Sequence, residues 1–270
     1  MKKIRKIVFD SLVIIFISLY VFVPIVAMIL HAFAEKWYAW HWWFPQKLGF
    51  KWFKDPMLLG EIPRAFFFSY TIAIVVSLVT LIITFSAGYV LATKEFKGRN
   101  IMDQIANLPF AFPAIVLGIA LLPIYSRIGL LRTYWGVILV HMVGAIPYTL
   151  RAVIGSFRSI PPEMEEAARN LGATKFVTLY KIYLPLTWPG LIAGAIFAFT
   201  WSLNEFVLTL LLGFPTIFTL PVNIAQYMGE YFLSPQRAAV LGLFLLIPTV
   251  ASLLIAEKYL TPESMGGGLG

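Results

Sequence analysis

The sequence of 270 residues contains no cysteine and few charged residues. Without cysteine it has no disulfide framework and no thiolate metal site. The three histidines, His31, His41 and His141, lack metal-ligand spacing, so we expect no bound metal and no other cofactor. The phosphate-binding pattern Gly-x-x-x-x-Gly-Lys-Ser/Thr is also missing. The missing phosphate-binding pattern argues against an ATPase.

Charged residues make up only 13% of the chain, whereas 60% of it is hydrophobic. Soluble proteins average about a quarter charged and about half apolar residues. This chain could not hide its apolar surface from water, so we expect it to lie in a bilayer. Its net charge of +8 then does not predict a nucleic-acid partner, because membrane proteins concentrate Lys and Arg in their cytoplasmic loops.

Six apolar segments are long enough to cross a membrane, which takes roughly 20 residues. They cover about residues 8–32, 66–93, 105–126, 134–156, 186–213 and 237–260. Proline inside a segment does not exclude a span, because neighbouring groups can satisfy the carbonyls that proline frees. The sequence predicts an all-α polytopic membrane protein with three parts: an N-terminal helix and external loop at 1–65, a five-helix core at 66–260, and a cytoplasmic tail at 261–270.

The distribution of Lys and Arg sets the expected orientation. With the N-terminus in the cytoplasm, 13 of the 21 basic residues fall on the cytoplasmic side, which favours that side for both termini. The first apolar run covers about 22 residues, more than the 7–15 of a cleaved secretory signal, so we expect it to remain as a helix. The same orientation places the polar segment 157–185 in the cytoplasm.

The polar segment 157–185 carries the signals of two short helices separated by a glycine. Pro162 and the acidic residues after it suit the first turn of a helix. Gly172 is typical of the left-handed residue that ends a helix. Thr174 can then cap a second helix, which we expect to run to Ile182.

The first of these helices has features of a contact surface. The Ala167-Ala168 pair is small enough to let another surface approach closely, and Glu166 is placed to meet a basic group. An alternative is an ordinary amphipathic connector lying on the membrane. The acidic residues argue against this alternative, because interfacial helices prefer Lys and Arg on their polar face.

Seven residues of the segment stand at the spacing of a known motif: Glu166, Ala167, Ala168, Gly172, Ile182, Leu184 and Pro185. This pattern resembles the EAA loop of permeases in binding-protein-dependent ABC importers of type I. Other strings that resemble this family are Pro113–Gly118, Gly129–Leu131, Thr133–Gly136 and Thr219–Val222.

The resemblance implies the permease fold of a type I ABC importer in a prokaryotic inner membrane. It also implies three kinds of protein partner: cytoplasmic ABC ATPase subunits that receive loop 159–182, a second permease subunit that is identical or different, and an extracytoplasmic solute-binding protein. In this family, closure of the ATPase dimer moves the permeases from inward- to outward-facing. Because the chain lacks a nucleotide-binding pattern, we expect ATP hydrolysis in a partner.

Four residues of the fifth predicted span are candidates for lining the solute path: Ser202, Asn204, Glu205 and Thr209. An acidic residue within a membrane is costly and is a functional candidate by default. Ser202, Glu205 and Thr209 recur at i, i+3 and i+7, so we expect them on one helical face. Alternatively, Glu205 pairs with Arg151 or His141. His141 itself is expected to be an interhelical hydrogen-bonding residue.

The same span carries small residues at every fourth position, namely Gly190, Gly194, Ala198 and Ser202. This spacing is typical of helices whose backbones approach closely in a membrane. We therefore expect one side of the span to pack tightly against another helix.

The sequence leaves the solute open between two groups. Ala168–Gly172 resembles the polyamine, ferric-iron and phosphonate permeases, whereas Trp201–Phe206 resembles the sugar and polyol permeases. The number of matched segments slightly favours a polyamine-like solute over a sugar or polyol. A different class of function is an ion-coupled secondary transporter with Glu205 as its proton site. An intramembrane enzyme would need paired catalytic groups, and the sequence has none at suitable spacing.

Overall fold

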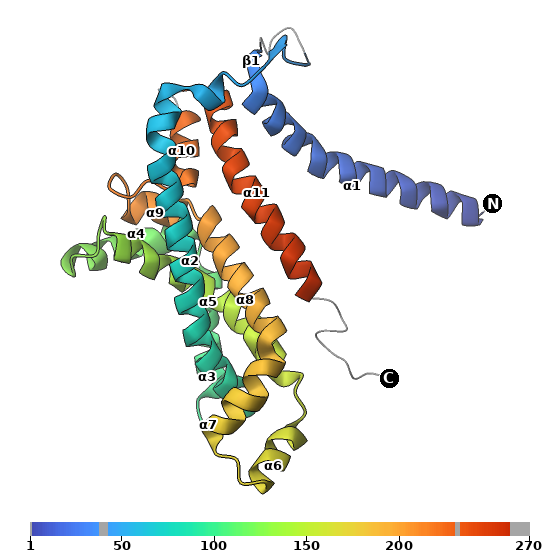
Figure 1. Cartoon of the computed structure of the whole chain (residues 1–270), viewed down its shortest axis with the longest axis vertical. Helices are drawn as coiled ribbons and strands as arrows, with labels where there is room; N and C mark the ends of the chain where they lie inside the picture. The colour runs from blue at the N-terminus through green and yellow to red at the C-terminus, as the bar shows by residue number, and fades with distance from the viewer. Residues whose placement is uncertain (1, 38–42, 230–232, 260–270) are drawn as a thin grey trace. The chain divides into compact units, whose positions relative to one another are not determined.

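The computed structural model describes residues 2–37, 43–229 and 233–259, and it is dominated by helices (Figure 1). The helices are α1 (Lys2–Phe33), α2 (Pro56–Thr93), α3 (Arg99–Asn107), α4 (Ala114–Arg127), α5 (Tyr134–Arg158), α6 (Pro162–Asn170), α7 (Lys175–Thr178), α8 (Leu184–Asn204), α9 (Val207–Leu212), α10 (Leu220–Tyr227) and α11 (Pro235–Tyr259). Two short strands, β1 (Ala34–Lys36) and β2 (Lys47–Leu48), pair antiparallel. The predicted all-α class is confirmed. The predicted tail at 261–270 lies outside the described residues.

The chain divides into two compact units. The first comprises Met1–Pro63 and Asn223–Leu246, and the second comprises Arg64–Val222 and Ile247–Gly270. In the first unit, Arg237 forms an ion pair with Asp55 at 3.0 Å, and the Tyr227 hydroxyl donates to Glu61 at 2.7 Å. These contacts fasten the end of α10 and the start of α11 to the start of α2.

Five of the described helices are long and apolar enough to cross a membrane: Phe9–Phe33, Pro56–Thr93, Tyr134–Arg158, Lys175–Asn204 and Pro235–Glu257. A sixth crossing requires α3 and α4 to act together as a bent pair. Every predicted span therefore falls mostly on helix within the described residues, but two of the six predicted spans differ in shape from a single continuous helix.

The predicted span at 105–126 is a bent pair of helices. α3 and α4 are separated by η2 (Leu108–Ala111), a short 3-10 turn, and the two arms are inclined by 105°. Phe112 has an extended backbone, with φ −115° and ψ 135°, where the chain turns. The physical reason is that Phe112 precedes Pro113, whose ring sterically disfavours the helical region for the residue before it.

The predicted span at 186–213 is interrupted as well. α8 ends at Asn204, Glu205 is extended with φ −71° and ψ 123°, and α9 begins at Val207. At its other end, α8 continues from α7 through η3 (Leu179–Tyr183), a π-helical segment. The helical span therefore starts before residue 186 and ends before residue 213.

α5 and α8 pack closely in the second unit. A Cβ atom on Gly190 would lie 2.3 Å from Ser156 Cβ, and one on Gly194 would lie 3.1 Å from Thr149 Cγ2. Side chains larger than glycine would not fit without movement at Gly190, so the predicted close packing of the small residues is confirmed. An apolar cluster that includes Phe157 lies at the end of α5 that leads into α6.

Candidate functional site

The first of the two short helices between α5 and α8 ends at a left-handed glycine. Gly172 has φ +79°, a conformation that glycine adopts without strain. The N–H of Gly172 donates to the Arg169 carbonyl at 2.9 Å, and the N–H of Ala173 donates to the Ala168 carbonyl at 3.0 Å. This pair of hydrogen bonds is a Schellman motif. The predicted helix end at Gly172 is confirmed.

The second short helix begins where its cap was predicted but does not end there. The Thr174 hydroxyl accepts a hydrogen bond from the Val177 N–H at 3.4 Å at the start of α7. The chain then continues through η3 into α8, so the helix does not stop at Ile182. The predicted helix–Gly–helix loop is confirmed, with the correction that its second helix is continuous with a membrane span.

The seven motif residues differ in exposure: Glu166, Ala167, Gly172 and Pro185 are exposed, Ala168 is buried, and Ile182 and Leu184 are half-buried. Apolar side chains of the loop that lie outside or between the motif positions are exposed as well. Leu171 is 89% exposed and Phe176 is 74% exposed. We call the exposed set Glu166, Ala167, Leu171 and Phe176 the outer face of the loop. Exposed apolar groups rimmed by polar ones are typical of a protein contact surface.

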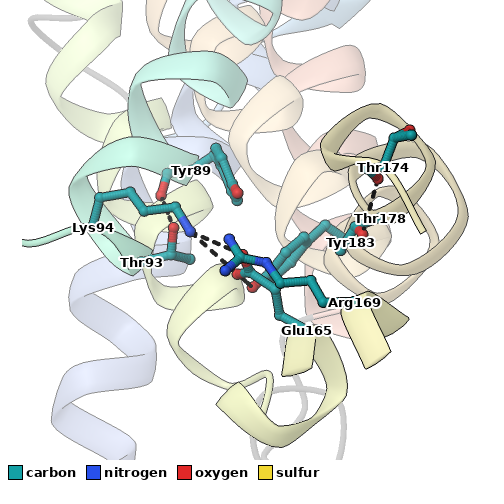
Figure 2. Close-up of polar contacts among 8 residues, drawn as sticks. All are labelled: Tyr89, Thr93, Lys94, Glu165, Arg169, Thr174, Thr178 and Tyr183. Atoms are coloured by element: carbon teal, nitrogen blue, oxygen red, sulfur yellow. Dashed lines mark hydrogen bonds and ion pairs between the residues drawn. The ribbon is translucent and has the colours of Figure 1, made fainter. Parts of the chain in front are cut away.

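Glu165, which the sequence interpretation passed over in favour of Glu166, makes the ion pairs of α6 (Figure 2). Lys94 Nζ donates to both Glu165 carboxylate oxygens, at 3.0 and 3.3 Å. The Tyr183 hydroxyl donates to Oε2 at 2.6 Å, and Arg169 Nη2 donates to Oε1 at 2.8 Å. The side chain of Glu165 is only 14% exposed. The sequence held no local signal for this difference, because Glu165 and Glu166 are chemically alike and the burial of Ala168, which shares the helical face of Glu165, is known only from the structure.

The contacts of Glu165 keep it and Lys94 charged. Burial alone would raise the pKa of Glu165, but hydrogen bonds from Tyr183 and Lys94 outweigh it and hold that pKa below its usual 4.5. Burial would likewise lower the pKa of Lys94, but hydrogen bonds to Glu165 and Tyr89 raise it above 10.5. The stabilisation from Glu165 is lost only as pH falls through its lowered pKa. That from Lys94 is lost only as pH rises through its raised pKa.

His141 lies fully buried in α5 and bridges the two halves of the interrupted span. Its Nδ1 is 2.8 Å from Ser202 Oγ in α8, and its Nε2 is 2.8 Å from Thr209 Oγ1 in α9. A neutral ring donates through one nitrogen and accepts through the other, so it can satisfy both hydroxyls. The prediction that His141 is an interhelical hydrogen-bonding residue is confirmed.

The prediction that Ser202, Glu205 and Thr209 share one helical face is wrong. The helix ends before Glu205, because the Glu205 carboxylate turns back and accepts a hydrogen bond from the Leu208 N–H at 2.8 Å. Glu205, which precedes the N-cap residue Phe206, thereby satisfies one N–H in the first turn of α9. Ser202 and Thr209 are buried against His141, so neither faces an open cavity.

Glu205 lines a pocket of about 240 Å³. Aromatic side chains from three segments, Phe110, Tyr148 and Trp201, share this pocket with it. The alternative pairing of Glu205 with Arg151 or His141 is not found among the described residues. Arg151 instead contacts Asn107 and Asp103, on α3.

Asn204, the remaining candidate for the solute path, is directed to a different helix. It is exposed, and its side-chain amide donates to the Thr200 carbonyl at 2.8 Å and to the Thr249 hydroxyl at 3.2 Å. It is absent from the lining of the Glu205 pocket. Of the four candidate residues, only Glu205 therefore faces this pocket.

Comparisons with known proteins agree on one kind of protein. Residues 85–263 match the family described as "Binding-protein-dependent transport system inner membrane component". The spermidine/putrescine transport system permease protein PotC of Escherichia coli (strain K12) is 27% identical, over 93% of this chain and 93% of that protein. The trehalose transport system permease protein SugB of Mycobacterium tuberculosis (strain CDC 1551 / Oshkosh) is 30% identical, over 74% of each.

A solved structure with a similar fold is that of a bacterial ABC transporter involved in the import of the acidic polysaccharide alginate. The TM-score is 0.69 at 19% sequence identity, and the match covers 94% of this chain and 96% of that one. At this low identity the likeness supports the fold alone.

Proposed function

Because the chain belongs to the binding-protein-dependent transport system inner membrane component family and is a permease subunit of an ABC importer, we propose that its loop 159–182 docks on a separate cytoplasmic ATPase. The loop would transmit the motion of that ATPase to the membrane helices. We also propose that both termini and this loop lie in the cytoplasm, in keeping with the excess of basic residues there. A second permease subunit and an extracytoplasmic solute-binding protein complete the proposed importer.

The outer face of the loop is the observation that carries this proposal. Leu171 and Phe176 expose most of their apolar surface, and Met164, Val177 and Tyr180 of the same segment are exposed as well. Glu166 of the same loop is exposed too, while the neighbouring Glu165 is occupied by contacts within the chain. Exposed apolar side chains, together with a carboxylate that has no partner among the described residues, suit a partner that offers an apolar cleft and a basic side chain.

The test is charge reversal on the outer face. With Glu166→Lys, we expect the tagged chain to insert in the membrane as before but to lose most of its co-purifying ATPase. Glu95→Lys is the control, because it makes the same change of charge at an exposed side chain of the connector between α2 and α3. Undiminished co-purification with Glu166→Lys would contradict the docking proposal. Equal loss with Glu95→Lys would mean that total charge, and not the outer face, controls binding.

For the solute path, we propose the pocket beside Glu205. Its lining combines one carboxylate with the aromatic rings of Phe110, Tyr148 and Trp201. Aromatic faces attract ammonium groups, and a carboxylate supplies the counter-charge, so the pocket favours a polyamine-like solute. A sugar or polyol is the second candidate, because a carboxylate also accepts hydrogen bonds from hydroxyls. Competition of unlabelled putrescine, spermidine and trehalose against labelled spermidine uptake separates the two.

A further inference from the structure

α6 turns only two of its residues inward. Within Pro162–Asn170, Ala168 is buried and Glu165 is half-buried, whereas the other residues are exposed. Glu165 and Ala168 are three positions apart, so they project from the same side of the helix. The attachment of α6 to the membrane helices therefore depends on one small apolar side chain and one carboxylate.

The carboxylate of Glu165 connects α6 to two other segments, one 71 residues earlier and one 18 residues later in the sequence (Figure 2). Lys94 directly follows α2, and Tyr183 is the last residue of η3, where α8 begins. Both donate hydrogen bonds to the same carboxylate. Arg169, the third donor, belongs to α6 itself and adds no link to another helix. We call Glu165, Lys94 and Tyr183 the Glu165 clasp.

The clasp is backed by packed aromatic rings. Tyr183 lies 5.2 Å from Tyr89 and 5.5 Å from Phe157 between ring centroids. The Lys94 ammonium lies 5.2 Å from the Tyr89 ring centroid, within range of a cation–π contact. Phe157 and Tyr183 are both buried, so the clasp is fixed to the ends of α2, α5 and α8 by close packing.

We infer that the Glu165 clasp makes α6, the end of α2 and the start of α8 move as one body when the ATPase moves the loop. This inference rests on the proposed function, and it assigns Glu165, Lys94 and Tyr183 as positioning residues, distinct from the outer face that touches the ATPase. Directed hydrogen bonds to a charged group resist sliding and rotation, which a contact through Ala168 alone would permit. Without the clasp, the ATPase would move the loop but not α2.

The distance between two spin labels measures directly whether α6 and the end of α2 move together. The chain has no cysteine of its own, so two introduced cysteines are the only sites that take a label. One label is placed on α6 with Glu163→Cys and the other on the α2–α3 connector with Lys97→Cys, both exposed positions. The purified complex with its ATPase is compared without nucleotide and after trapping with ATP and vanadate. We expect one narrow distance that is the same in both states.

Lys94→Met breaks the link to α2 while leaving Tyr183 and Arg169 on the carboxylate. In this variant we expect the two states to differ in label distance or the distribution to broaden, with ATPase co-purification retained. Lys94→Arg, which keeps the charge, should restore the narrow distance. Arg158→Met is the control, because it removes an exposed charge at the end of α5 that makes no ion pair with Glu165 in the described residues.

Three results would overturn the inference. The first is a wild-type distance that changes between the two states, since α6 and α2 would then move separately. The second is a Lys94→Met distribution identical to that of Arg158→Met. The third is loss of the ATPase in Lys94→Met, because the clasp would then only fold the docking surface. Failure of the proposed function is a separate outcome, in which the wild-type chain does not retain an ATPase at all.

Discussion

Replacing Gly172 tests the loop through its backbone alone. Gly172 has φ +79°, and apart from its own atoms and its two chain neighbours no heavy atom of the described residues lies within 4 Å of where its Cβ would stand, so a methyl group fits there. Alanine in this conformation costs about 1 kcal/mol relative to glycine, and asparagine costs less. Proline fixes φ near −65° and removes the N–H that bonds the Arg169 carbonyl, so it cannot form the Schellman motif.

The expected order for ATPase binding is glycine, asparagine, alanine and then proline. A cost of about 1 kcal/mol, if the loop must keep this shape to dock, lowers the apparent affinity of the Gly172→Ala variant by at most about fivefold. We expect Gly172→Asn to stay within about twofold of wild type and Gly172→Pro to abolish both binding and solute uptake. The assay is titration of the detergent-purified chain with the purified ATPase, with membrane insertion checked by yield.

Two results would refute this reasoning. Wild-type binding by Gly172→Pro would mean that the helix–Gly–helix shape is not required for docking. An asparagine variant that binds much more weakly than the alanine variant would mean that the side chain, and not the backbone conformation, decides the effect. The second result would place a partner surface directly over Gly172.

Three further predictions concern Glu205, His141 and the ion pair of Glu165 with Lys94. Glu205→Gln should change the rate of spermidine uptake with assembly intact, and unchanged kinetics would make Glu205 structural, as the acceptor for the Leu208 N–H in the first turn of α9. His141→Phe should destabilise the purified chain by about 1 kcal/mol in thermal unfolding, because it loses two membrane-buried hydrogen bonds worth roughly 0.6 kcal/mol each. Ser202→Ala loses one of these two hydrogen bonds, so its destabilisation should be about half as large. Protection of the loop from proteolysis should not vary between about pH 6 and pH 9, since the pKa of Glu165 is lowered and that of Lys94 is raised; a fall within that range would contradict these shifts.

The features that the sequence predicted correctly are those set by local rules. Apolar length located the spans, and cap chemistry located the end of α6 at Gly172 and the start of α7 at Thr174. The two helix ends depend on residues within one helical turn, and the spans depend only on the apolar length of a continuous stretch of chain. The small residues of α8 were also interpreted correctly, because their spacing reports how closely a neighbouring backbone can approach.

The features that the sequence did not reveal depend on contacts between distant segments. Periodicity continues across Glu205, but its carboxylate bonds the Leu208 N–H and ends one helix while starting another. Glu165 and Glu166 are chemically alike, and only the positions of Lys94 and Tyr183 decide which of them is held inside. The family motif drew attention to Glu166, whereas the contacts of this chain single out Glu165.

Photo-cross-linking from the outer face measures the proposed docking most directly. A benzophenone label on Leu171→Cys, in the otherwise cysteine-free chain, should cross-link to the co-purified ATPase in high yield, because Leu171 is 89% exposed on the outer face. The same label on Phe9→Cys, an exposed position of α1, is the control and should give no ATPase adduct. Adducts from Phe9→Cys but not from Leu171→Cys would contradict docking through loop 159–182.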